Sequence, residues 1–77
     1  MTALQTIDQA CDRIRSGESL ETAVTWVYNH CMTDKQKVGF DLWLVSIGHR
    51  LAWEAGTSEY RFREMVREFA TRYGIFA

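Results

Sequence analysis

Apolar residues recur every three or four positions over most of this chain, which is the spacing of one face of an α-helix. In the first such stretch, Thr2 and Gln5 have the spacing of a capping box that opens a helix. Gly17 predicts its end, since glycine commonly follows the last turn of a helix. The apolar residues of this predicted helix are Leu4, Ile7, Cys11 and Ile14.

Ser19 is a suitable cap for a second helix, whose apolar residues are Leu20, Val24, Val27 and Cys31. Thr33 and Gln36 form another capping box, which predicts a third helix that runs on to Gly56. Apolar residues between 38 and 52 cover more than one face of this third helix. We therefore expect it to be central and touched by several neighbours, with its internal glycines, Gly39 and Gly48, marking close approach of helices.

Thr57 or Ser58 caps a fourth predicted helix, which Gly74 ends. Its apolar residues are Phe62, Met65, Val66, Phe69 and Tyr73. The chain has no proline and no run in which polar and apolar residues alternate, so nothing favours a sheet. The pattern predicts an all-α fold, with residues 1–77 forming a single domain that is a compact bundle of about four short helices.

Composition agrees with a small folded protein, because 47% of the 77 residues are hydrophobic and 25% are charged. The net charge of −1 disfavours both a strongly basic nucleic-acid coat and a strongly acidic nucleic-acid mimic. No secretion signal and no membrane-spanning stretch are apparent, which predicts a cytoplasmic protein with reduced cysteines. If the first two helices pack antiparallel, Cys11 and Cys31 lie too far apart for a disulfide.

Residues that could carry chemistry do not form a recognisable catalytic or metal-binding set. Cys31 follows His30 directly, and neighbours on a helix point about 100° apart, which is a poor arrangement for a nucleophile and its base. The spacings of the cysteines and histidines match no usual zinc site, and no glycine-rich phosphate loop occurs. The sequence predicts a protein that is not an enzyme and that needs no metal or cofactor.

Several large aromatic residues fall outside the apolar stripes, among polar neighbours. Trp26 aligns with His30 on the second helix, Trp53 aligns with polar residues on the third, and Tyr60 aligns with arginines on the fourth. Exposed Trp, Tyr and Arg residues dominate the energetics of many protein interfaces, although a small bundle can also use such rings in its core. The candidate partner-binding residues are Trp26, His30, Trp53, Tyr60, Arg63 and Arg67.

The segment 48–73 resembles the helix-turn-helix of small repressors. Ala52 takes the place of the small residue at the helix contact, Gly56 that of the turn glycine, and Ser58 that of the residue that opens the recognition helix. The resemblance implies that DNA would be contacted by Ser58, Glu59, Arg61, Arg63 and Arg67. Between Gly48 and Gly74 there are five Arg and four Glu, a weak positive footprint for DNA, and the preceding predicted helix is long for this motif.

The features together favour a non-enzymatic module that binds another protein. Size and the lack of a catalytic set fit a small bacterial or phage inhibitor that occludes its partner, of the anti-CRISPR kind. Two alternatives remain: a small helix-turn-helix DNA-binding regulator that uses 48–73, and a homodimeric adaptor whose aromatic rings meet at the two-fold axis.

Overall fold

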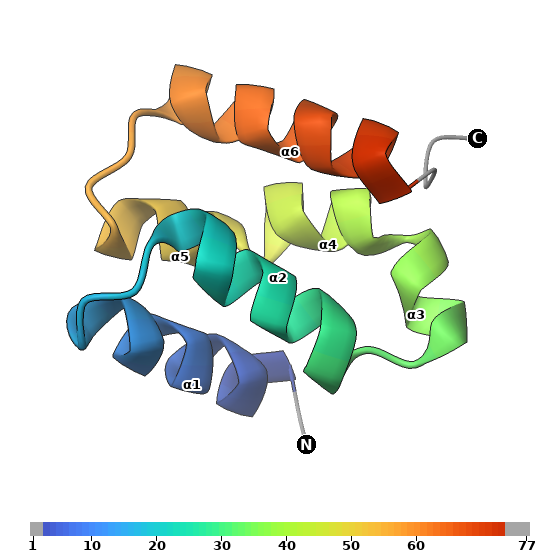
Figure 1. Cartoon of the computed structure of the whole chain (residues 1–77), viewed down its shortest axis with the longest axis horizontal. Helices are drawn as coiled ribbons and strands as arrows, with labels where there is room; N and C mark the ends of the chain where they lie inside the picture. Colours follow the sequence, from blue (N-terminus) through green and yellow to red (C-terminus); the bar gives the residue numbers. More distant parts are fainter. Residues whose placement is uncertain (1–2, 74–77) are drawn as a thin grey trace.

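Six helices make up the part of the chain that this computed structural model describes, which is residues 3–73. They are α1 (Ala3–Arg15), α2 (Leu20–Cys31), α3 (Asp34–Val38), α4 (Phe40–Ser46), α5 (His49–Glu54) and α6 (Glu59–Tyr73). The described residues contain no strand, so the predicted all-α bundle is confirmed. In Figure 1, α6 lies along one side, α4 and α5 lie beneath it, and α1 lies on the opposite side.

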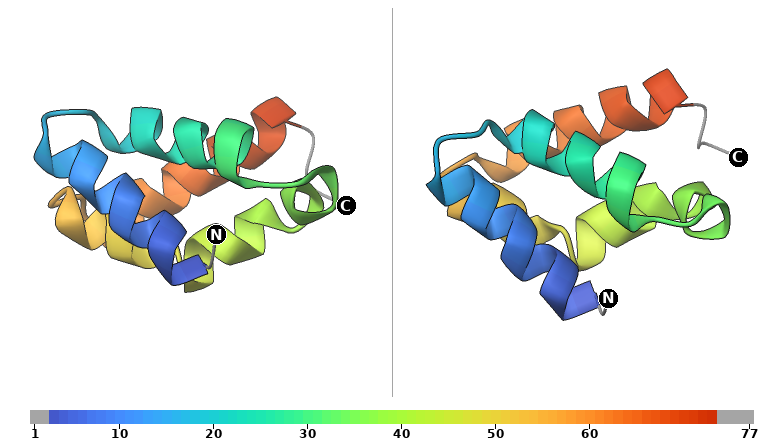
Figure 2. Two further views of the ribbon diagram at one scale, coloured as in Figure 1. Left: turned by 90° about the horizontal axis from the view of Figure 1, so that it is seen from below. Right: turned by 60° about the horizontal axis from the view of Figure 1, so that its bottom comes forward.

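Packing between the helices follows from this arrangement. α1 contacts both α2 and α5, whereas α6 packs mainly on α4. The two rotated views in Figure 2 show α1 and α2 as an antiparallel pair joined by the short turn at Gly17. The predicted antiparallel packing of the first two helices is therefore confirmed.

The ends of the helices agree with the capping signals in the sequence. The Thr22 backbone N–H donates to the Ser19 hydroxyl at 3.1 Å, and both hydrogen bonds of the predicted Thr33–Gln36 capping box are present. At the start of α6, where the sequence offered Thr57 or Ser58 as the cap, the Ser58 Oγ accepts a hydrogen bond from the Arg61 backbone N–H. Thr2 lies outside the described residues.

Two glycines adopt the left-handed conformation after a helix end. Gly17 has φ 110° and Gly56 has φ 68°, values that residues with a Cβ rarely adopt. The sequence placed helix ends at both positions, and both are confirmed.

The prediction of one long third helix is wrong, because the segment forms α3, α4 and α5 instead. Gly39 separates α3 from α4, and a tight turn at Ile47 and Gly48 separates α4 from α5. At Gly48 the chain approaches itself so closely that a Cβ would lie 2.9 Å from the Leu44 Cα. No atom lies within 4 Å of a Cβ built at Gly39, so of the two glycines only Gly48 marks the predicted close approach.

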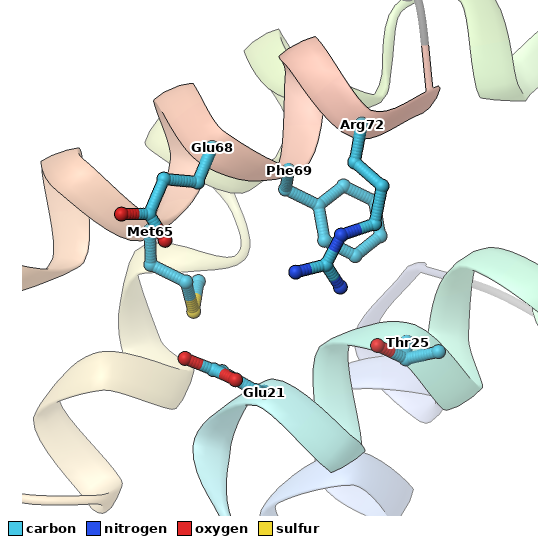
Figure 3. A pocket seen from close by; sticks show the side chains of 6 residues that line it. All are labelled: Glu21, Thr25, Met65, Glu68, Phe69 and Arg72. Carbon is cyan, nitrogen blue, oxygen red and sulfur yellow. The ribbon is translucent and has the colours of Figure 1, made fainter.

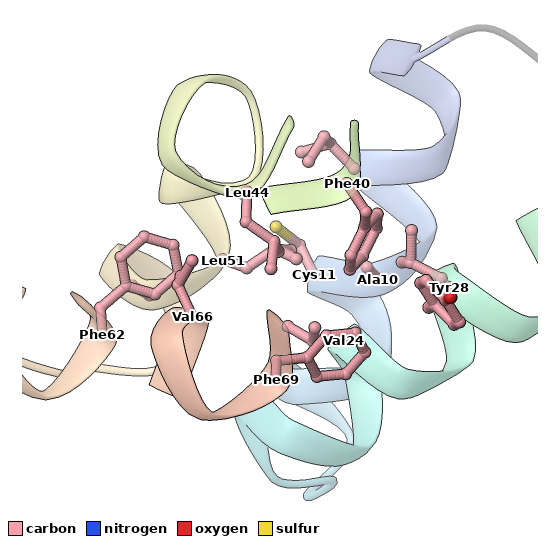
Figure 4. Packing of buried hydrophobic residues seen from close by; sticks show 13 residues of the cluster. Ala10, Cys11, Val24, Tyr28, Phe40, Leu44, Leu51, Phe62, Val66 and Phe69 are labelled. Carbon is pink, nitrogen blue, oxygen red and sulfur yellow. The ribbon is translucent and has the colours of Figure 1, made fainter. Parts of the chain in front are cut away.

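The core is centred on a group of aromatic rings, which Figure 4 shows. Phe40 is fully buried; its ring centroid lies 5.1 Å from that of Tyr28 in an edge contact and 5.3 Å from that of Trp43 in a stacked one. Phe69 of α6 lies 5.4 Å from Phe40, so the rings join α2, α4 and α6. The other fully buried large side chains are Ile7, Cys11, Val24, Val27, Leu44, Leu51 and Phe62.

Two predictions about buried residues are wrong. Leu4, placed in the apolar stripe of the first helix, is 70% exposed. The segment 38–52 is not enclosed on all sides, because Val38 and Leu42 are 71% and 68% exposed. α4 packs mainly on α6 and buries Phe40 and Leu44, whereas Leu42 on its other side stays exposed.

Candidate protein-binding surface

Trp53 and Tyr60 are the most exposed of the aromatic side chains predicted to bind a partner. Trp53 of α5 is 79% exposed and Tyr60 of α6 is 70% exposed. On α5 the buried residues are Leu51 and Ala52, which leaves Trp53 on the opposite side of a short helix. Both rings therefore lie where the sequence placed them, outside the core.

Trp26 lies among polar residues of α2, as predicted, but its ring is less exposed than those of Trp53 and Tyr60. It is half-buried and packs against the hydrophobic core. The guanidinium of Arg13 lies 4.2 Å from its ring centroid, and Arg13 also forms a 3.3 Å ion pair with Glu18. Arg13 of α1 thus partly covers this indole of α2, which helps to hold that helix pair together.

His30 is exposed and lies with Trp26 on a shallow groove of about 410 Å³ that is lined mainly by polar and charged residues. Residues of α1, α2 and the C-terminal part of α6 line this groove: Arg13, Glu18, Glu21, Thr22, Thr25, Trp26, Asn29, His30 and Arg72. The predicted partner residues therefore occupy two separate places. Trp26 and His30 lie on α2, and the remainder lie on α5 and α6.

A smaller cavity of about 20 Å³ lies between α2 and α6, where Figure 3 shows Glu21 and Thr25 facing the α6 side chains Glu68 and Arg72. The volume is enough for about one water molecule. This cavity is too small to bind a ligand.

A second groove, of about 320 Å³, lies where α4, α5 and α6 meet. Its lining residues are Val45, His49, Glu59, Phe62 and Arg63. The His49 ring makes an edge contact with Phe62 at 5.2 Å between centroids, and an Arg63 Nη2–Glu59 Oε1 ion pair of 3.0 Å lies on the α6 side. The groove combines an apolar interior with a charged rim, and its lining residue His49 lies one helical turn before the exposed Trp53. We call it the α5 groove.

The arginines of α6 are exposed, as the sequence predicted. Arg63 is paired with Glu59, and within residues 3–73 Arg61 and Arg67 form no ion pair. Ser58, the first residue of the predicted DNA-binding set, uses its hydroxyl to accept the Arg61 backbone N–H at 3.3 Å. Its side chain therefore has a structural role as a helix cap.

Sequence reasoning missed an apolar surface on the outside of α3 and α4. Val38, Leu42 and Val45 are between 49% and 71% exposed, and we call them the α4 surface. Leu42 and Val45 are three residues apart on one helix, so they share a face. The apolar residues on more than one face of the segment 38–52 were the sequence signal for this surface, but the same pattern fits a central, enclosed helix.

Neither thiol is in a setting that favours nucleophilic chemistry. Both cysteines are free; Cys11 is buried and Cys31 is half-buried. Burial raises the pKa of each thiol above its usual value, which keeps sulfur in its less reactive protonated form. Exposed His30, the neighbour of Cys31 in sequence, lines the polar groove on the outside of α2.

The described residues were also considered for a metal site and for a helix that spans a membrane. Among residues 3–73, potential metal ligands nowhere gather in a group of three or more. Over the same residues, every helix is too short or too polar to cross a lipid bilayer.

Comparisons with protein families, curated proteins and solved structures found no relative of this chain. This chain matches no protein-family model, no curated protein and no solved structure among those searched.

Proposed function

We propose that this protein is a non-enzymatic module that binds another protein and acts by covering part of its surface. The α4 surface carries the proposal, because it gathers large aliphatic side chains on the exposed side of a short helix whose other face is buried. Contiguous exposed apolar surface commonly marks a protein interaction site. Val38 and Leu42 are the most exposed aliphatic residues of this surface and are the natural anchors of an interface.

The charges around this surface suit a protein partner better than a nucleic acid. Asp34 and Lys37 form an ion pair on α3, with 3.9 Å between Oδ1 and Nζ, and Asp41 lies on α4. The α4 surface therefore has no excess of positive charge that would attract a phosphate backbone. A protein with an exposed apolar groove or helix face is the complementary partner.

Leu42→Glu is expected to weaken partner capture strongly while leaving the fold intact. A charge at the centre of an apolar contact must be desolvated, so we expect binding to weaken by about tenfold or more. Quantitative mass spectrometry of proteins retained by the immobilised chain measures capture, followed by titration of the purified partner. Because Leu42 is 68% exposed, the substitution should change the free energy of unfolding by only about 0.5 kcal/mol. The melting temperature should then shift by about 2–4 °C.

Gln9→Glu is the matched control for this experiment, since Gln9 is exposed on α1 and the change introduces the same charge. The control should capture the partner as the unchanged protein does. Equal capture by the Leu42→Glu and Gln9→Glu proteins would contradict a binding role for the α4 surface.

A DNA-binding regulator is the second candidate, because the structure removes one objection to it. α5 is a short helix, Gly56 has the positive φ of a tight turn, and α6 follows directly, which is the arrangement expected from the resemblance to small repressors. Arg61 and Arg67 are exposed on α6. Glu59 and Glu64 on the same helix oppose phosphate binding.

Fluorescence anisotropy with random duplex DNA separates the two candidates. For a protein that binds another protein, we expect no DNA binding whose affinity falls steeply as the salt concentration rises. If α6 does bind DNA, the logarithm of affinity falls linearly with the logarithm of salt concentration, and Arg61→Ala or Arg67→Ala reduces the slope by about 1 each. Arg72→Ala, at the far end of α6, is the control. A steep slope that these two variants reduce would replace the protein-binding proposal.

A further inference from the structure

Trp53 and the α5 groove lie next to each other on one helix. His49 lines the groove, and Trp53 follows it by four residues, so the two side chains lie one turn apart on the same face of α5. The Cβ atoms of such a pair are about 5–6 Å apart. The protein thus presents an exposed indole directly beside a partly apolar hollow.

This pairing is self-complementary. If two copies pack with their α5 helices antiparallel, and the two-fold axis crosses the exposed face of α5 midway between positions 49 and 53, then position 53 of each copy faces position 49 of the other. Each indole then meets the hollow of the opposite copy. We propose that a second copy of this chain covers the α5 face, with Trp53 of each copy entering the α5 groove of the other.

Charges on this face are compatible with a second copy. Arg50 forms an ion pair with Asp8 of α1 at 3.5 Å, and Glu54 forms one with Arg15 at 2.7 Å. Like charges near the axis are therefore already neutralised within each copy, which removes a repulsion that would oppose self-association.

The rim of the groove also suits an indole. Arg63 lies there with a largely exposed side chain, and a guanidinium over a Trp face is a favourable cation–π contact. Val45 and Phe62 supply apolar contacts beneath the ring. The groove volume of about 320 Å³ leaves room for one large side chain.

The area available sets the expected strength of the dimer. A large aromatic residue buries about 150–250 Å², and the reciprocal arrangement buries two indoles together with both grooves. A standard interface buries about 800 Å² from each partner, so this contact lies at the weak end. We expect a dimer that dissociates on dilution in the micromolar range.

Sedimentation equilibrium from about 1 µM to about 1 mM measures this association. The unchanged protein should approach twice the monomer mass as concentration rises. Trp53→Ala, which removes an exposed ring, and Val45→Glu, which places a charge in the groove, should each weaken dimerisation by about tenfold or more. Circular dichroism checks the fold, and Trp53→Ala decides the outcome if Val45→Glu fails to fold.

Leu42→Glu is the matched control for Val45→Glu, since it makes the same change on the same helix outside the groove. It should dimerise as the unchanged protein does. A protein that stays monomeric up to the highest concentration, or a Trp53→Ala variant that dimerises normally, would overturn the proposal. So would loss of the dimer in Leu42→Glu. Val45 belongs to both the α4 surface and the α5 groove, so the two proposals share this residue. Loss of partner capture in Leu42→Glu with the dimer intact, and loss of the dimer in Trp53→Ala with partner capture intact, separate them.

Discussion

Replacing Phe40 by alanine is expected to unfold much of the protein at room temperature. Phe40 is fully buried and its ring contacts those of Tyr28, Trp43 and Phe69, so the change leaves a cavity where three helices meet. Such Phe→Ala substitutions cost about 3–5 kcal/mol. A domain of this size has a total free energy of unfolding of about the same magnitude, so the variant would keep little stability.

Urea unfolding followed by circular dichroism measures this loss. Val38→Ala is the control, because Val38 precedes Phe40 by two residues but is 71% exposed, and its unfolding midpoint should change little. An unchanged midpoint in Phe40→Ala would contradict the central position of this ring.

Gly48→Ala is expected to have the next largest effect. The added Cβ would lie 2.9 Å from the Leu44 Cα and 3.0 Å from an atom of the Trp43 ring. Backbone cannot move aside cheaply, so α4 and α5 must separate slightly, and overpacking of this kind costs about 1–3 kcal/mol. The melting temperature should fall by about 4–8 °C for each kcal/mol.

Gly39→Ala is the matched comparison, since both glycines interrupt the segment between Thr33 and Gly56. No atom lies within 4 Å of a Cβ at Gly39, and its φ is −103°. Alanine should therefore be tolerated there, or stabilise the protein by about 0.4–1 kcal/mol through a less flexible unfolded chain. If the two variants lose equal stability, the close approach at Gly48 is not the reason for its glycine.

Local signals in the sequence predicted α1, α2 and α6 well. Capping depends on side-chain and backbone groups three residues apart, so Ser19, Thr33 and Ser58 could be identified from sequence alone. The glycines after helix ends, Gly17 and Gly56, carry the positive φ that glycine favours. These features need no knowledge of distant residues.

The candidate site was only partly predictable. Helical spacing placed Trp53 and Tyr60 outside the stripes, and both are exposed. The same reasoning separated Trp26 from the core, but Arg13 from the preceding helix covers its ring. The α5 groove was not foreseen, because it forms only where α4, α5 and α6 meet.

The amino-acid pattern by itself determined that the chain is helical, where three of its helices begin and end, and most of the residues that they bury. Tertiary structure alone decided that the segment after Thr33 breaks into α3, α4 and α5, and that Leu42 faces outward while Leu44 faces the core. The physical reason is the range of the interactions. Caps and helical periodicity act within a few residues, whereas burial depends on which distant helix, here α6, packs against a given face.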